Sequence, residues 1–495
     1  MKNIIKVIII FTTVSLFGCQ SFEEVSVNPN LATSAPASLV MNGILYDMHE
    51  GAWNKMMRHN QFYAINYNYY GDNEYSWTTT DVRWNQLKNV IKMEEEAKKS
   101  TGKDLNPYSA MGKFLRAYFF TYMTARVGDL PLTDALKGTG NITPKYNTQK
   151  EVYVQILKWL DDANTDMASL IAAGDRSMTG DIYLKNDLKA WQKVVNAFRL
   201  RVLISLSKKE SDGELNIKKQ FSDIVSNPSK YPLMASGADN MQYTYNSVFN
   251  KYPINPDNFG FDATRQNMAA THIGLLVSLK DPRVFLVAEP AEAKLKAGLK
   301  ATDFEAYVGA SNAESLDDMS TKIISGQYSL INRKRYYSGY TPEPTINIGY
   351  SEQSFNIAEG IHRGWATGNA AAYYESGIKS SLSFFAISDA AQAEYLAQDK
   401  VKYAGSNADG LTQILSQKYL AFFQNSGYEA FFNNRRTGIP KFADNGPGTG
   451  NSGKIARRWL YPNSERLYNK TNYESALTSQ YGGKDDINND VWIVK

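Results

Sequence analysis

Apolar side chains recur at intervals of three and four residues over long stretches of this chain, and no other feature limits its possible folds as strongly. Between residues 107 and 123 they cover one broad face, which matches the 3.6-residue turn of an α-helix. Thr148 and Glu151 form a T-x-x-E capping signal directly before a second such stretch. Similar patterns begin at Trp84 and at Asp187. We therefore predict four amphipathic helices in this part of the chain.

The remaining sequence contains shorter helical candidates separated by irregular stretches. Residues 227–262 and 440–495 are rich in Tyr, Asn and Gly and predict loops. Strand-like alternation is scarce, and we find no fixed repeat period. We therefore expect a mostly α-helical protein, with residues 39–495 in a single domain. The shorter helices are expected at residues 215–225, 263–279, 354–363, 370–385 and 411–423.

The N-terminal residues carry the pattern of an export signal. A lysine-bearing start precedes an apolar run at residues 7–14, which is shorter than the roughly 20 residues of a spanning helix. Leu16-Phe-Gly-Cys19 follows, and Cys19 is the only cysteine of the chain. Leu-x-Gly-Cys resembles the bacterial lipobox, in which the cysteine thiol is acylated after cleavage. We predict a signal peptide over 1–18 and a lipid-anchored linker over 19–38. The alternative is a free cysteine beside an ordinary cleavage site.

Charge and composition exclude some classes of partner. The formal net charge is +4 and falls to +2 when Lys2 and Lys6 leave with the signal peptide, so nothing indicates binding to nucleic acid. The hydrophobic content of 43% is typical of a globular domain. Tyrosine is unusually frequent, with 32 Tyr against 22 Phe. A ring with a polar tip suits wet surfaces and interfaces.

Short motifs follow one another from the lipobox to residue 492. They are Asn28-Pro29-Asn30, Arg126–Ala135 (RVGDLPLTDA), Trp191–Arg201 (WQKVVNAFRLR), Asp281-Pro282-Arg283, Ile357–Trp365, Tyr374–Ile378, Gln417–Tyr419, Tyr428–Ala430, Arg435–Pro440, Arg457–Pro462, Glu465 and Val491-Trp492. In this order and spacing they resemble the SusD/RagB family of nutrient-binding outer-membrane lipoproteins, and most closely its SusD-like branch. One motif departs from the family's W-G-D-x-P-Y-x-x-A, because Arg126 and Val127 stand in the tryptophan region.

The resemblance implies a fold and a function. The fold would consist of helix–turn–helix pairs of tetratricopeptide type, with a loop-rich portion packed on them. The protein would lie on the outer membrane, held by its lipid and facing the exterior. It would capture a glycan, an oligosaccharide or a peptide and pass it to a TonB-dependent, SusC-like transporter. The resemblance implies no enzymatic activity and no cofactor.

An aromatic-rich segment between residues 60 and 84 is the candidate binding region. Eight aromatic residues fall within these 25 positions, interleaved with Asn, Asp and Glu. Rings stack on apolar sugar faces, and amides or carboxylates bind the hydroxyls. We predict ligand contacts at Tyr70, Tyr75 and Trp77, whereas Trp84 is expected in the core. The alternative is that these rings only pack a loop against the helices.

Other motifs carry no convincing chemistry. Gly448–Gly453 matches G-x-G-x-x-G, but no hydrophobic strand precedes it, so we predict a loop rather than a nucleotide site. Asp486-x-Asn488-x-Asp490 opens like a calcium loop but lacks the following Gly and the closing Glu. No two of the four histidines have zinc-ligand spacing, so we predict no metal site. The Arg435-Arg436 and Arg457-Arg458 pairs are expected to donate to loop carbonyls.

Three functions remain open from the sequence. The first is capture of a nutrient, most simply a glycan, beside a transporter. The second is a scaffold of the transporter complex that binds no ligand itself. The third is an anchored glycan hydrolase, which would need two carboxyl groups facing each other across one cleft. The sequence contains no hydrolase signature that would favour the third function.

Overall fold

The computed structural model describes residues 34–495 of the chain, and these residues are mostly helical. The expected signal peptide and Cys19 lie outside the described residues, as does most of the expected linker. Helix α3 begins at Ala37, within the last residues of that linker. The helices are α3 (Ala37–Asp47), α4 (Lys55–His59), α5 (Trp84–Thr101), α6 (Pro107–Val127), α7 (Gln149–Ala172), α8 (Leu188–Ser205), α9 (Ile217–Ser226), α10 (Ala270–Ser278), α11 (Val284–Val287), α12 (Glu292–Lys296), α13 (Leu316–Ile324), α14 (Arg333–Tyr336), α15 (Tyr350–His362), α16 (Ala370–Phe384), α17 (Asp389–Leu396), α18 (Ala408–Ala421), α19 (Glu429–Thr437), α20 (Asn463–Tyr468) and α21 (Lys470–Tyr481).

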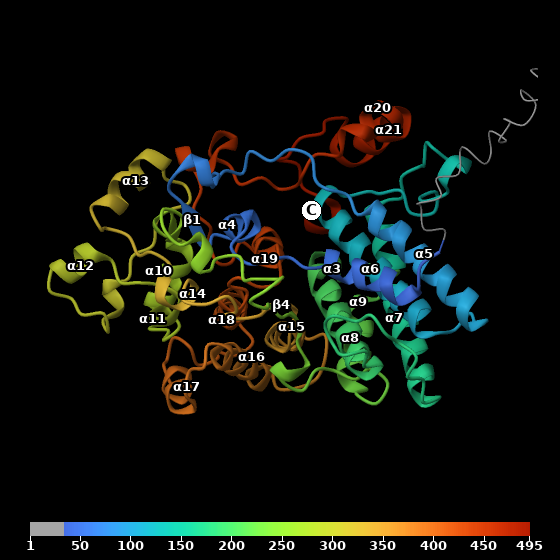
Figure 1. Ribbon diagram of the computed structural model, residues 1–495, viewed down its shortest axis with the longest axis horizontal. Helices are drawn as coiled ribbons and strands as arrows, with labels where there is room; N and C mark the ends of the chain where they lie inside the picture. The colour runs from blue at the N-terminus through green and yellow to red at the C-terminus, as the bar shows by residue number, and fades with distance from the viewer. Residues whose placement is uncertain (1–33) are drawn as a thin grey trace, which may run out of the picture.

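Packed helical pairs build one side and the middle of the molecule. Helix α6 packs between α5 and α7, and α7 packs on α8, while α15 packs on α16 and α18. Figure 1 shows α5–α9 on one side, α10–α14 on the other, and α15, α16, α18 and α19 between them. The four long helices expected from residue 84 onward are confirmed as α5–α8.

The sequence determines where these long helices begin. Asn106 and Thr148 each form a capping box with the residue three positions later, and Asp187 accepts a hydrogen bond from Lys189 N. Each cap satisfies backbone N–H groups that the first turn leaves without an intrahelical partner. The T-x-x-E signal is therefore confirmed as the start of α7.

Two small antiparallel sheets connect the loop-rich part to the helices. Strand β1 (Tyr63–Ile65) pairs with β3 (Gln266–Met268), and β2 (Met241–Tyr243) pairs with β4 (Thr345–Ile348). The expected helix over 263–279 is wrong in its first part, because residues 266–268 pair with β1 and α10 begins only at Ala270. The expected loop over 440–495 is also interrupted by α20 and α21.

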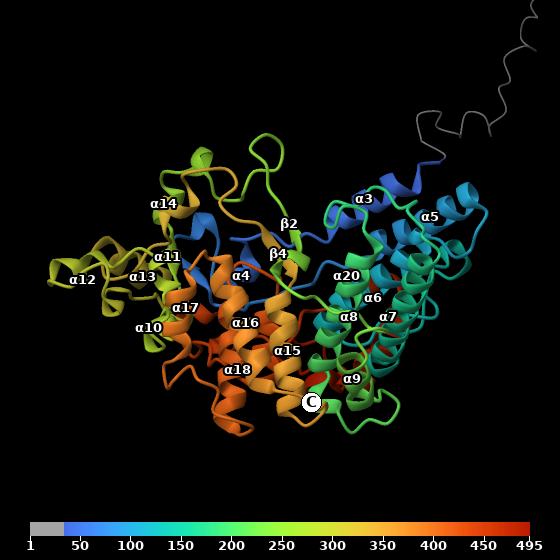
Figure 2. The same ribbon diagram turned by 90° about the horizontal axis from the view of Figure 1, so that it is seen from below.

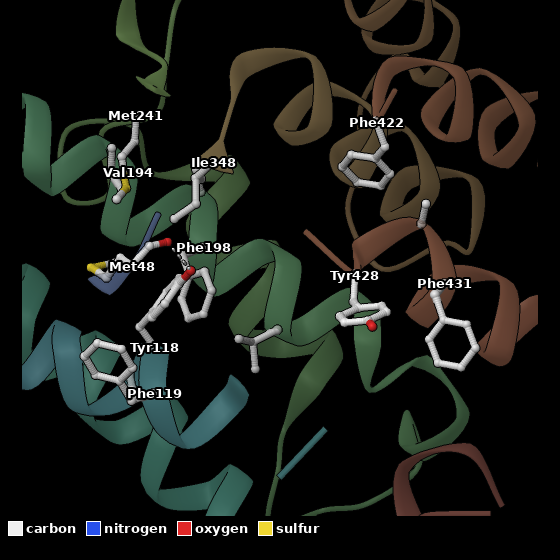
Figure 3. Close-up of a cluster of buried hydrophobic side chains, with 14 of the residues drawn as sticks. Met48, Tyr118, Phe119, Val194, Phe198, Met241, Ile348, Phe422, Tyr428 and Phe431 are labelled. Atoms are coloured by element: carbon white, nitrogen blue, oxygen red, sulfur yellow. Dashed lines mark hydrogen bonds between the residues drawn. The ribbon is translucent and has the colours of Figure 1, made fainter. Parts of the chain in front are cut away.

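One hydrophobic core extends through the helices on both sides of the molecule. It takes in residues from Ala37 to Val494. Figure 3 shows part of it, where side chains of α6 and α8 meet the loop-rich half. The residues labelled there are Met48, Tyr118, Phe119, Val194, Phe198, Met241, Ile348, Phe422, Tyr428 and Phe431. Because apolar burial is the main favourable term in folding, this shared core ties the halves together.

Buried ion pairs join the central helices. Arg201 of α8 donates to Glu352 of α15 at 2.6 Å, and Arg436 of α19 donates to Glu359 of α15 at 3.0 Å. Burial opposes ionisation of Glu359, but the charge of Arg436 and, more weakly, those of Lys418 and Arg363 lower its pKa to about 2. These pairs fix the position of α15 between its neighbours.

The arginine pairs have divided roles. Arg435 donates to the carbonyls of Ala125 and Arg457, and Arg457 donates to the carbonyl of Arg435, as predicted. Arg436 instead binds Glu359, and Arg458 binds Asp485. Arg458 also donates to the carbonyl of Asp486 at 3.3 Å, so the prediction of carbonyl partners is wrong only for Arg436, whose guanidinium binds the buried carboxylate of Glu359.

Arg126, which stands in the tryptophan region of the family motif, occupies an aromatic cage. Its guanidinium lies 3.3 Å from the centre of the Tyr122 ring and 5.4 Å from that of Trp459. It also pairs with Glu50 at 3.5 Å. A cation over aromatic faces thus fills space in the core where an indole is expected.

Candidate functional site

Two loops far apart in the sequence lie side by side at one end of the β1–β3 sheet. Because the strands are antiparallel and Ile65 faces Gln266, the chain leaving β1 and the chain entering β3 emerge at the same end. Asn66 joins them, since its backbone N–H donates to Arg265 O (3.1 Å) and its amide to Thr264 O (3.2 Å). We call residues 66–72 and 256–265 the paired loops. Figure 1 places β1 on the side away from α5–α7.

The paired loops expose several aromatic rings to solvent. Tyr69 is 81% exposed and Phe261 is 78% exposed, and Tyr67 and Phe259 are about half-exposed. Tyr70 is partly buried, with the ring of Tyr69 edge-on to it at 5.1 Å. We call these five residues the aromatic patch. Exposed aromatic rings gathered on neighbouring loops are candidates for contact with a ligand or a partner.

Side-chain hydrogen bonds hold the first loop in shape. Asn73 binds both the N–H and the carbonyl of Ile65, at 2.9 and 2.8 Å, which closes the turn. Arg58 donates to the carbonyl of Tyr70 at 3.4 Å. Gly71 has a φ of +118°, and a Cβ there would lie 2.9 Å from the Arg58 guanidinium. Glycine is therefore favoured at this position, because other residues rarely adopt this backbone angle.

The second loop is fixed through Asp262. This carboxylate accepts from Tyr337 Oη at 3.0 Å and from Gln266 Nε2 at 3.2 Å. Burial, together with the charge of Asp262, raises the pKa of Tyr337 above its usual value, so the phenol stays protonated and donates. Phe259 packs edge-on to Tyr337 at 5.4 Å, which positions its ring.

The patch combines apolar faces with polar groups at its edge. The Arg265 guanidinium lies 4.8 Å from the ring centre of Tyr67, next to the backbone bridge between the loops. Exposed rings offer flat apolar area at a small cost in side-chain entropy, and tyrosine adds a hydrogen-bonding tip. Such a surface fits a ligand that has both an apolar face and hydroxyl groups.

Of the three predicted ligand contacts, the structure places only Tyr70 on the patch. Tyr75 is 0% exposed and Trp77 is 5% exposed. Tyr75 Oη donates to His59 O at 2.7 Å, and its backbone N–H donates to Thr449 O at 2.8 Å. These two rings are used in packing, so their faces are not available for stacking on a ligand. Trp84 is half-buried against the core at the start of α5.

Phe259 and Phe261 were not among the ligand contacts predicted from the sequence. They lie in the segment Asp257–Asp262, where two phenylalanines flank a glycine among polar residues. Two large apolar side chains in a loop without helical or strand periodicity were the available signal. Phe259 and Phe261 lie near the loop of residues 66–72 only because β1 pairs with β3, and no local sequence pattern predicts that pairing.

The other candidate motifs remain structural. The Gly448–Gly453 segment forms two short 3₁₀ turns, and Thr449 within it is buried.

Burial lowers the pKa of His49 to about 4 and, with the charge of Arg283, that of His272 to about 3. Residues 34–495 contain no group of three or more His, Cys, Asp or Glu side chains placed to hold a metal ion. Nor does any helix in this range combine the length and apolarity needed to cross a bilayer.

Comparison with known proteins relates most of the chain to one family. The family described as "starch-binding associating with outer membrane", SusD-like, matches residues 29–462. An outer-membrane protein of Bacteroides vulgatus, for which a role in nutrient binding has been suggested, is 33% identical. The alignment covers 93% of this chain and 100% of that one, with a TM-score of 0.82. A SusD homologue of Bacteroides fragilis is 32% identical over the same shares of the two chains, with a TM-score of 0.84.

More distant structures share the fold. A chitin-binding SusD homologue of Flavobacterium johnsoniae is 21% identical, with 93% of this chain and 98% of that chain covered and a TM-score of 0.71. No curated protein matches the chain. The mostly helical fold expected from the sequence is confirmed by these matches. The chain therefore belongs to the SusD-like family, which is described as starch-binding and associating with the outer membrane.

Proposed function

We propose that the protein captures a neutral glycan at the cell surface through the aromatic patch. The single observation that carries this proposal is the exposure of Tyr69 and Phe261 on two loops that are hydrogen-bonded to each other. Loops fixed in this way present their rings with little further loss of entropy on binding. Tyr67, Tyr70 and Phe259 extend the platform, and the tyrosine hydroxyls are available to the ligand's hydroxyl groups.

The relatives support a glycan as the ligand. The family description names starch, and two solved structures with this fold are described as chitin-binding. Both polysaccharides are uncharged chains of sugar rings whose apolar faces stack on aromatic side chains. Which of these sugars the chain prefers depends on the shape of the paired loops, so it has to be measured.

The site acts by binding and not by catalysis in this proposal, and it needs no cofactor. Acylation of Cys19 holds the protein on the outer leaflet, because two or more acyl chains give stable anchoring. The bound glycan then passes to a TonB-dependent, SusC-like transporter.

A binding screen tests this proposal. Residues 20–495 include every residue of the described core, and affinity electrophoresis or calorimetry with these residues would cover starch, chitin and other glycans, with a peptide panel beside them. Binding of a glycan that is recovered intact supports capture. Recovery of cleaved product would favour the anchored hydrolase. Failure to bind either panel would favour the scaffold of the transporter complex.

A further inference from the structure

A cavity lies away from the paired loops, between β4 and the α15–α16 hairpin. It has a volume of about 590 Å³ and shares no lining residue with the aromatic patch. Its walls come from the β2–β4 ribbon, the start of α15, the second half of α16 and the turn that follows α18. Figure 2 shows β2 and β4 at one end of α15 and α16. Ligand pockets in proteins commonly span about 300–1,000 Å³.

The cleft is built from well-fixed backbone. Ile346 N donates to Asn425 Oδ1 at 2.8 Å, and Ser426 N donates to Ile346 O at 2.8 Å, which ties β4 to the turn after α18. Tyr350 N donates to Asn240 Oδ1 at 2.8 Å, which ties the start of α15 to the segment before β2. Four separate segments are thus locked around one space, so the cavity is preformed.

Its lining joins apolar walls to uncharged polar groups. Ile346, Phe384 and Phe422 supply apolar surface. Ser380 and Tyr350 also line it. Neither hydroxyl makes a hydrogen bond to another group in the described part of the chain. The amide nitrogen of Asn240 is likewise without a partner there, since only its oxygen is used. A mostly apolar cleft with a few convergent hydroxyl and amide groups has the composition of a small-ligand site.

Charge restricts the class of ligand. Glu352 lines the cleft, but its carboxylate is bound by Arg201 at 2.6 Å and both residues are buried. Lys379 stands at the rim, where its side chain is 55% exposed and lies 4.0 Å from Glu375. An ionic ligand would therefore find no unpaired, buried charge of opposite sign. A neutral ligand rich in hydroxyl groups could pair with the uncharged hydroxyl and amide groups of the cleft and pack against its apolar wall.

We propose that this cleft is a second binding site, which takes a short neutral oligosaccharide independently of the aromatic patch. Hydroxyls of the sugar would pair with Ser380, Tyr350 and Asn240, and a ring face would lie against the apolar wall. The choice of a sugar rests on the proposed function, whereas the existence of a separate site rests on the cleft itself.

A single-cysteine protection experiment tests this site. Residues 20–495 contain no cysteine, so Ser380→Cys introduces one thiol on the cleft wall without a large change in volume. The thiol is titrated with a maleimide dye in the presence of maltoheptaose or chitohexaose. We expect one of these sugars, at saturation, to slow labelling at least tenfold. Ala372→Cys is the matched control, because it is exposed on the same helix outside the cleft, and its labelling should not change.

Repeating the experiment in a variant that lacks the aromatic patch separates this inference from the proposed function. The protection is repeated in a protein that also carries Tyr69→Ala and Phe261→Ala. Persisting protection supports an independent cleft, even if all binding at the patch is lost. Protection that vanishes with the patch overturns the second site and leaves the first intact. Absence of protection by either sugar also overturns the inference.

Discussion

The indole rings of Trp77 and Trp459 stack face to face, with ring centres 3.7 Å apart and an interplanar angle of 16°. The first ring belongs to the segment that leads into α5, and the second precedes α20. Trp77 also contacts His59, with Nε1 3.2 Å from His59 Nε2. This stack joins an early loop to a segment close to the end of the chain. An aromatic residue in a tyrosine-rich loop thus serves stability here.

Trp77→Ala should destabilise the fold. A buried Trp→Ala change leaves a cavity and costs about 3–5 kcal/mol in the free energy of unfolding. Urea denaturation followed by circular dichroism measures the loss. Tyr69→Ala is the control, and because that side chain is exposed the change should stay within about 0.5 kcal/mol. Equal stability of the two variants would mean that Trp77 is not packed as described.

Tyr69→Ala combined with Phe261→Ala should weaken glycan binding without unfolding the protein. Two lost stacking contacts are worth about 1–3 kcal/mol, or roughly 5- to 150-fold in Kd. Calorimetry with the glycan found in the screen measures this change. Tyr468→Ala removes a ring of similar exposure on α20 and should leave Kd unchanged. An equal loss in both variants would argue against the aromatic patch.

Glu359→Gln should cost about 3–5 kcal/mol at neutral pH, because it leaves Arg436 buried without its carboxylate. The pKa of Glu359 in the fold is about 2, below the ordinary value of 4.5. Its contribution is therefore complete above about pH 4.5 and is lost as the pH falls toward 2. The stability difference between wild type and variant should shrink over that window.

Urea unfolding at a series of pH values checks this dependence. Glu394→Gln, an exposed position on α17, is the control and should alter the free energy of unfolding by no more than about 0.5 kcal/mol. A difference between wild type and Glu359→Gln that stays constant down to pH 2 would contradict the role given to the ion pair.

Cys19→Ser should release the protein from membranes. The thiol is the acceptor of the lipid in the predicted anchor, and serine cannot form the thioether. Fractionation of cells should move the variant from the membrane to the soluble fraction, and mass spectrometry should show no acyl groups on it. Ser21→Ala, two residues away, should stay in the membrane fraction. Membrane association of Cys19→Ser would point to attachment through a protein partner.

The long helices could be predicted because their signals are local. Capping residues and apolar periodicity mark α6 and α7 within the helices themselves. Helix α21 was missed because few of its residues are apolar, with Tyr473, Ala476 and Leu477 buried. Residues 266–268 were misassigned because a partner about 200 positions away, at β1, determines their strand conformation.

The binding region was predictable only in part. A density of aromatic residues pointed to the loop that contains Tyr70, but it did not separate exposed rings from buried ones. That separation depends on tertiary neighbours such as Trp459 for Trp77 and His59 for Tyr75. The position of Phe259 and Phe261 beside this loop depends on strand pairing, so it could be recognised only from the tertiary structure.

The pairing of β1 with β3 also bears on how ligand preference could change during evolution. The two loops share hydrogen bonds at Asn66, so an insertion or deletion in either loop would shift the rings carried by the other. The two loops should therefore change together when the ligand specificity of this protein changes. A chimera that exchanges residues 63–73 with a relative should gain that relative's preference only when residues 256–268 are exchanged with them.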